Sequence, residues 1–409
     1  MSRRTLEYAC GVVLVGLLAG AAGAATTLLL HFVEHLTYHY SFGTLLSGVG
    51  NSSPVRRAVG PMIGGLLAGV GWWMLRRRGD VPSLSATIAD HRPLPRWRMS
   101  IDAALQVLLV GSGASLGREG APRQLAASLG DAGISRWALT ARDREVLLAC
   151  AAGAGLAAVY SVPLGGALFA SQILLRTWHP RAVGTALITS SLAVAVASPV
   201  THLEHPLSWP DPSLSYLYVG LAVVIAPLAV VVGLTFDKVM TLARPKPQLR
   251  SWTLIPAIAL AGLATGIASI WWPELPGNGR SILTVSVNAD LTLGGAVVIL
   301  LLKPLLTAVF LRAGAVGGMI TPALATGAAA GSVATLALNH FAGTDLQVAA
   351  ISLACAAGVL AITQRAPGFA ALFVWELAHP PYWVILAFLA AAFTAHGVRL
   401  LRERRASAT

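Results

Sequence analysis

The chain has 409 residues, of which 56% are apolar and only 11% are charged. Soluble domains carry about 25% charged residues, and the mean hydropathy here is +0.70. This composition excludes a soluble enzyme, a disordered chain and a nucleic-acid-binding domain. The net charge of +12 is typical of a membrane protein with basic cytoplasmic loops.

Apolar runs follow one another along the chain. The first, residues 8–30, is long enough to cross a bilayer and has no cleavage signature, which predicts a membrane helix rather than a signal peptide. Glycine or proline interrupts several of the later runs, and broken helices at membrane depth occur only inside protein or around a watery cavity. We therefore predict an all-α polytopic membrane protein forming a single membrane domain, 1–409. The further spans are expected at 60–75, 101–116, 145–175, 183–200, 214–236, 252–272, 291–312, 315–338, 348–377 and 382–400.

Basic residues gather in some loops and are missing from others. The loops at 76–78, 92–98 and 244–250 and the tail at 399–405 are basic, whereas 202–213 and 338–348 contain no Lys or Arg. By the positive-inside rule the basic group is cytoplasmic. We expect an integral protein of a prokaryotic inner or plasma membrane with both termini in the cytoplasm. The tryptophan pairs at 72–73 and 271–272 are interpreted as interfacial anchors.

An internal repeat organises the chain. The hexapeptide Leu-Ala-Cys-Ala-Ala-Gly at 148–153 recurs 205 residues later at 353–358. Other features match at offsets of 199 to 204: Val162-Pro163 with Ala366-Pro367, 117–121 with 318–322, and 78–82 with 277–281. This pattern predicts two halves, 1–208 and 213–409. If the halves are inverted repeats of tilted and broken helices, their glycine-rich breaks meet near the midplane, where transporters bind substrate.

Glu119 stands inside one of these glycine-rich breaks. A carboxylate at the membrane centre costs about 2.5–3.5 kcal/mol on insertion scales. Such a residue is functional by default, and we interpret Glu119 as a proton carrier or as the gate of an ion pathway. The alternative is a structural pair with the neighbouring Arg118.

Glycines flank this acidic residue and recur at three other breaks. Gly117 and Gly120 allow the backbone to expose N–H groups at the start of the next helix, and 317–322 does the same in the second half. Helix N-termini bind anions through free amides and a partial positive charge. Together with 277–279 and 79–80, these breaks predict an anion site made mainly of backbone.

These motifs resemble those of the CLC family of chloride channels and proton-coupled chloride antiporters. The family carries Gly-(Lys/Arg)-Glu-Gly-Pro where this chain has 117–121, Gly-x-Phe-x-Pro where it has 318–322, and Gly-Ser-Gly-x-Pro where it has 78–82. The resemblance implies a homodimer with one anion pathway per subunit, gated by Glu119. It also implies that the transported ion contacts backbone N–H groups near these motifs. The residues expected to bind the anion are Gly79, Asp80, Val81, Gly117, Arg118, Gly120, Gly318, Met319 and Ile320.

The chain also departs from the family pattern. The central serine falls on Gly79, no tyrosine follows Tyr382, and the position of the inner proton-accepting glutamate reads Gln172-Ile173. Without a titratable group there, we expect chloride transport that is channel-like or weakly proton-coupled. A proton-coupled chloride or fluoride antiporter is the alternative.

The remaining expectations concern ligands and other classes of protein. Outside the transporters, an intramembrane enzyme or a structural membrane protein is the different-class alternative. His31, His35 and His39 are spaced for one helix face, but we interpret them as interfacial residues and expect no metal site. No cofactor beyond the transported halide is expected, and the expected partners are inorganic anions, protons and the lipid bilayer, with no nucleic acid.

Overall fold

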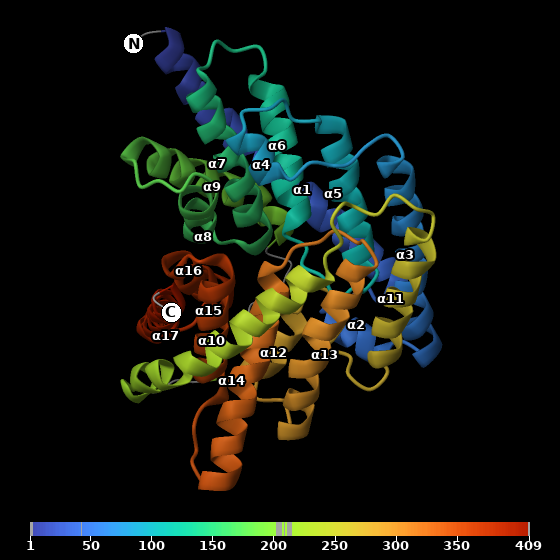
Figure 1. Ribbon diagram of the computed structural model, residues 1–409, viewed down its shortest axis with the longest axis vertical. Coiled ribbons are helices and arrows are strands. Elements are labelled where there is room, and N and C mark those ends of the chain that lie inside the picture. The colour runs from blue at the N-terminus through green and yellow to red at the C-terminus, as the bar shows by residue number, and fades with distance from the viewer. Residues whose placement is uncertain (1–2, 42, 202–206, 208, 211–214, 408–409) are drawn as a thin grey trace.

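The computed structural model describes residues 3–41, 43–201, 207, 209–210 and 215–407. The predicted boundary between the two halves, 208–213, lies largely outside the described residues. The chain folds into helices throughout (Figure 1). In order they are α1 (Arg3–Tyr38), α2 (Leu45–Asn51), α3 (Pro54–Arg76), α4 (Leu84–Ala89), α5 (Arg96–Gly111), α6 (Gly120–Ile134), α7 (Ala141–Tyr160), α8 (Pro163–Leu168), the π-helix η1 (Phe169–Leu174), α9 (Pro180–Thr201), α10 (Leu217–Ala243), α11 (Leu254–Ala268), α12 (Arg280–Val287), α13 (Leu293–Arg312), α14 (Ile320–Ala342), α15 (Val348–Gln364), α16 (Pro367–Ala378) and α17 (Val384–Ser407).

The helices differ widely in length. Among the described residues, seven helices are long and apolar enough to cross a membrane: α1, α3, α9, α10, α13, α14 and α17. Shorter apolar helices, such as α11, α15 and α16, lie among them. The prediction of an all-α polytopic membrane protein is therefore confirmed.

Two long predicted spans, 145–175 and 348–377, are each broken in the same way. Ser161 ends α7 with φ 56°, and Arg365 ends α15 with φ 56°. A proline then starts the next helix, Pro163 in α8 and Pro367 in α16. Proline is favoured at the first helical position and disfavours helix for the residue before it. The repeated sequence motif thus gives the same geometry in both places: a helix, a left-handed residue and a second helix that begins at proline.

Small residues let these helices pack closely. Figure 1 shows α3 and α11 side by side at one edge of the molecule. A β-carbon on Gly65 of α3 would overlap the backbone of α11, and one on Gly262 of α11 would overlap the backbone of α3 at Pro61. Close backbone approach through small residues is the usual packing mode between membrane helices. Many of the chain's glycines serve this packing rather than ion binding.

Two details differ from the interpretation of the sequence. Trp72 is fully buried, and its indole N–H donates to Asp102 Oδ1 at 2.7 Å, so it belongs to the protein interior rather than to an interfacial belt. His39 has φ 54° and follows the end of α1, so it leaves the helix face on which the rings of His31 and His35 stack, 6.3 Å apart. Periodicity alone could reveal neither the polar partner of Trp72 nor the point at which α1 ends.

Candidate anion pathway and gate

The glycine-rich breaks of the two halves meet in space. Gly117 N donates to Gly318 O at 2.9 Å, and Gly318 N donates to Gly117 O at 2.8 Å. These two hydrogen bonds form an isolated antiparallel β-bridge. It joins the segment before α6 to the segment before α14. The two breaks that the repeat paired in sequence are therefore direct neighbours.

The Glu119 side chain lies against the N-terminus of α14. Its Oε1 accepts hydrogen bonds from Ile320 N at 2.5 Å and from Thr321 N at 3.4 Å. Its Oε2 accepts from the Thr321 hydroxyl at 3.1 Å and from the Tyr160 hydroxyl at 3.4 Å. Glu119 has no exposed surface. Amides at a helix N-terminus favour negative charge, so the carboxylate occupies a set of four donors that suits an anion.

Glycine is required around this carboxylate. A β-carbon on Gly117 or on Gly318 would overlap the Glu119 carboxylate, and one on Gly120 would overlap the side-chain amide of Gln106. The breaks therefore serve two purposes. They expose backbone donors, and they leave the volume that the acidic side chain fills.

Arg118 packs on the ring of Tyr160, one of the four donors to Glu119. Its Nη2 donates to Val159 O at 3.1 Å, and its guanidinium carbon lies 4.9 Å from the centroid of the Tyr160 ring. Only 5% of the residue is exposed. A guanidinium stacked on an aromatic face gains a cation–π interaction. Arg118 therefore braces the ring whose hydroxyl reaches Glu119.

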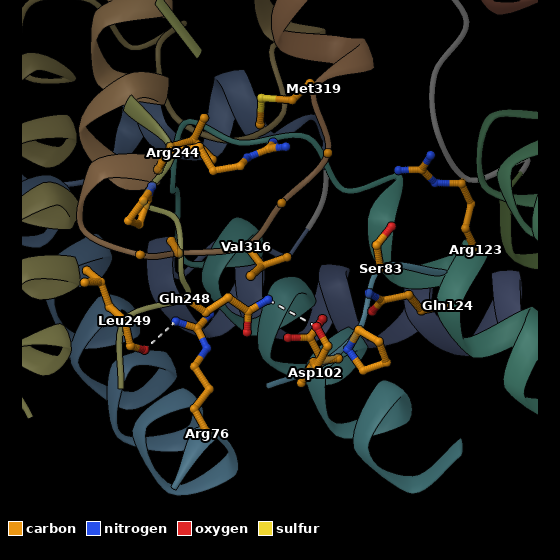
Figure 2. Close-up of a pocket in the computed structure, with 18 of the residues that line it drawn as sticks. Arg76, Ser83, Asp102, Arg123, Gln124, Arg244, Gln248, Leu249, Val316 and Met319 are labelled. Carbon is orange, nitrogen blue, oxygen red and sulfur yellow. Dashed lines mark hydrogen bonds between the residues drawn. The ribbon is translucent and has the colours of Figure 1, made fainter. Parts of the chain in front are cut away.

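A cavity of about 430 Å³ opens beside the start of α14. Four predicted anion-binding residues line it: Val81, Gly318, Met319 and Ile320. Figure 2 shows Arg123, Gln124 and Ser83 on one side of the cavity, with Arg244 and Met319 on the other. The charged residues of its wall are Arg76, Arg123, Arg244 and Asp102. Three guanidinium groups against one carboxylate make the wall net positive, which concentrates anions.

Gly79 and Asp80 are not among the lining residues of this cavity. The Gly79 carbonyl accepts from the Arg98 guanidinium. Asp80 accepts two hydrogen bonds from Arg250, at 3.0 and 2.9 Å, and this pairing lowers the pKa of Asp80. The Asp80 carboxylate is therefore paired with Arg250 outside the cavity. Ser83 lines the cavity instead; it stands at the N-cap of α4, and its side chain makes no capping hydrogen bond to the helix.

The fourth glycine break, 277–279, is held in place by a buried lysine. Lys303 has no exposed surface, and its Nζ donates to Leu275 O at 3.0 Å and to Gly277 O at 2.8 Å. Gly277 N donates to Gly113 O at 3.2 Å. This break is thus tied to the segment that precedes Gly117. The Lys303 amine therefore ties the chain at 275–277 to α13.

Gln172 and Glu376 join η1, α8 and α16. Gln172 Oε1 accepts from Phe369 N at 3.4 Å, so a neutral amide stands where the family resemblance places a proton acceptor. Glu376 Oε1 and Oε2 accept from the amides of Leu164 and Gly165, at 2.9 and 2.6 Å. Glu376 therefore caps α8 much as Glu119 caps α14.

Sequence reasoning missed four polar residues of this region. Tyr160, Arg123 and Ser83 approach Glu119 or the cavity from segments that read as apolar or as ordinary helix starts, and Thr321 lies in the break 317–322, which was expected to contribute backbone donors. One signal was available for Arg123, because it follows Glu119 by four residues, one helical turn. For the others, only the fold shows which way the side chain points.

Comparison with known proteins identifies the family of this chain. The model of the voltage gated chloride channel family matches residues 64–400. The chain belongs to this family, the CLC family. It is 29% identical over 374 residues to the voltage-gated ClC-type chloride channel ClcB of Escherichia coli (strain SMS-3-5 / SECEC), with 89% of this chain and 88% of the relative covered.

Solved structures of this CLC family share the fold. A slow cyanobacterial Cl⁻/H⁺ antiporter superimposes with a TM-score of 0.76 at 20% identity, covering 96% of this chain and 94% of the antiporter. A CLC-type fluoride/proton antiporter gives a TM-score of 0.65 at 19% identity, covering 96% and 95%. This CLC protein is therefore an integral membrane protein of an anion-transporting family.

Proposed function

We propose that this CLC protein carries chloride across the membrane through a pathway that Glu119 gates. The supporting observation is the donor set on the Glu119 carboxylate, formed by the amides of Ile320 and Thr321 and by two hydroxyl groups. These donors suit a chloride ion as well as a carboxylate. An ionised Glu119 competes with chloride for them. A protonated Glu119 is a weaker acceptor and leaves them to the ion.

The coupling of this flux to protons follows from the groups that can titrate. Gln172 cannot carry a proton from the inner side, and its amide is engaged with the start of α16. This supports channel-like or weakly coupled transport. Proton-coupled antiport is the second candidate, because the structures with the same fold include a chloride/proton and a fluoride/proton antiporter. A buried acidic gate is compatible with either mechanism.

The direction of the pathway is part of the proposal. Arg76 and Arg244 line the cavity and belong to the basic loops that the positive-inside rule assigns to the cytoplasm. We place the cavity on that side, as the inner vestibule of each subunit of a homodimer. The accessibility of Lys246→Cys, in a chain otherwise free of cysteine and probed from either side of a sealed vesicle, tests the orientation.

One experiment tests gate and coupling together. Chloride-loaded proteoliposomes are diluted into low-chloride buffer while chloride efflux and external pH are recorded. For wild type we expect efflux that rises as pH falls, with no uphill proton movement. Glu119→Gln should conduct at every pH tested. The matched control, Glu403→Gln, alters an exposed carboxylate near the C-terminus and should behave as wild type.

The outcomes separate the proposals. Retention of wild-type pH dependence by Glu119→Gln would remove Glu119 from the gate. Uphill proton movement driven by the chloride gradient in wild type would decide for antiport. Replacing chloride by fluoride in the same assay tests the fluoride alternative.

A further inference from the structure

Two buried polar residues on one face of α13 contact the glycine-rich breaks. Lys303 and Thr307 lie one helical turn apart, and neither has exposed surface. Lys303 stands near the middle of a helix that is long and apolar enough to cross the membrane. A basic side chain at that depth is costly and is therefore a candidate functional residue. The four donors on Glu119 include neither residue, so an effect on the gate has to pass through the backbone that they hold.

Lys303 holds the glycine break that precedes α12. Its Nζ donates to the carbonyl oxygens of Leu275 and Gly277, at 3.0 and 2.8 Å. Space around this break is tight, because a β-carbon on Gly279 would lie 2.6 Å from Ala325 Cβ of α14 and 3.3 Å from Lys303 Cε. The break is therefore packed between Lys303 and the first turns of α14, the helix whose amides face the gate.

Thr307 holds the segment that leads to the gate. Its hydroxyl donates to Ser115 O at 2.8 Å, lies 3.3 Å from the Ser115 hydroxyl and also contacts Lys303 O, at 2.9 Å. The same segment is tied to the break before α12, since Gly277 N donates to Gly113 O at 3.2 Å. The two side chains of α13 thus hold this segment at two points, Thr307 directly and Lys303 through Gly277.

The segment is bonded to α14 on its other side. Gly117 and Gly318 exchange two backbone hydrogen bonds, at 2.9 and 2.8 Å. Two residues after Gly117, the Glu119 carboxylate accepts from Ile320 N at 2.5 Å. Because a hydrogen bond weakens as its length and angle depart from the optimum, a small shift of this backbone would weaken the contacts of the ionised carboxylate.

We propose that Lys303 and Thr307, together the α13 clamp, are positioning residues of the gate. They fix the backbone before Glu119 against the start of α14, so that the ionised carboxylate meets its donors in one defined geometry. The inference rests on the proposed function, because the clamp acts through Glu119. Releasing the clamp weakens the contacts of the ionised carboxylate and favours its protonated form, which leaves the donors to the anion.

Thr307→Val tests the clamp without a change of charge or volume. It removes the hydroxyl that reaches Ser115 O. In chloride efflux from proteoliposomes, we expect the half-maximal pH to rise by about half a unit. Lys303→Met removes both hydrogen bonds to the break before α12 and should move this pH in the same direction. Thr307→Ser keeps the hydroxyl and should restore the wild-type value.

Hydrogen exchange of residues 112–119 supplies a second measurement on the same purified variants. In Thr307→Val these amides should exchange about tenfold faster, as expected for the loss of one hydrogen bond. The matched control is Thr265→Val in α11. Thr265 has no exposed surface, and its hydroxyl donates to Ala261 O of its own helix at 3.2 Å. This control should leave both the half-maximal pH and the exchange of 112–119 at the wild-type values.

The results distinguish the clamp from the gate. If Thr307→Val changes neither the half-maximal pH nor the exchange of 112–119, the clamp is overturned, even where Glu119→Gln conducts at every pH. Faster exchange with an unmoved half-maximal pH would also overturn it, because Thr307 would then serve only the fold, and so would an equal shift in Thr265→Val. If Glu119→Gln keeps the wild-type pH dependence, the proposed gate falls, and the exchange of 112–119 alone decides whether α13 holds this segment.

Discussion

Thr321 offers a sharp test of the gate because its hydroxyl can be replaced by a methyl group of similar size. Its hydroxyl donates to Glu119 Oε2 at 3.1 Å, while its backbone amide lies 3.4 Å from Oε1. Thr321→Val keeps the volume and the amide and removes only the hydroxyl donor. A hydrogen bond to a charged group contributes about 1.5–3 kcal/mol. We use the lower figure, because Thr321→Val also removes this hydrogen bond from a chloride ion or water molecule that replaces the carboxylate.

That change should be visible in the pH dependence of chloride efflux. If Glu119 gates the pathway as proposed, the Thr321 hydroxyl stabilises its ionised, site-occupying form, and the loss of this hydroxyl favours protonation and release. A difference of about 1.4 kcal/mol corresponds to one pH unit. We therefore expect the half-maximal pH of efflux to move upward by about one unit, with a higher rate at neutral pH.

The matched control lies five residues further along the same helix. Thr326 is as buried as Thr321, and its hydroxyl donates to Pro322 O at 2.8 Å, away from Glu119. Thr326→Val should leave the pH midpoint at the wild-type value. An unshifted midpoint in Thr321→Val, or an equal shift in both variants, would refute the assignment of this hydroxyl to the gate.

Three further predictions concern the surroundings of the gate. Gly318→Ala places a methyl group where the Glu119 carboxylate lies, so efflux measured in proteoliposomes should lose most of its pH dependence. Glu376→Ala leaves two amides of α8 without an acceptor. It should lower the free energy of unfolding by about 3 kcal/mol, seen as a lower Tm in detergent. Glu376→Gln keeps one acceptor oxygen and should show only part of this loss. The pKa of Asp80 is lowered by Arg250, so their pairing stabilises the fold above the ordinary pKa of an aspartate and is lost as pH falls below it. The Tm difference between wild type and Asp80→Asn should accordingly shrink below about pH 4, and a difference that stays constant down to pH 3 would contradict this.

The sequence alone predicted the features that depend on local pattern. Hydropathy located the spans, because about 20 apolar residues cross a bilayer wherever they occur in a chain. Glu119 stood out because a carboxylate in such a span is costly. The matched motifs at 148–153 and 353–358 marked two helices that end in the same turn. Motif matching also indicated the CLC family, which the family comparison confirmed.

The tertiary structure decided which donors surround the Glu119 carboxylate and which do not. A helix start exposes amides wherever it lies, but only long-range packing places the start of α14 against Glu119, 201 residues away in the chain. The alignment of one motif also differed from the structure. Motif matching placed the family's central serine at Gly79, whereas Ser83, four residues later, lines the cavity. Tyr160, Thr321 and Arg123 gained their roles only when separate helices converged, because the direction of a buried side chain is set by the neighbours it packs against, which no local pattern contains.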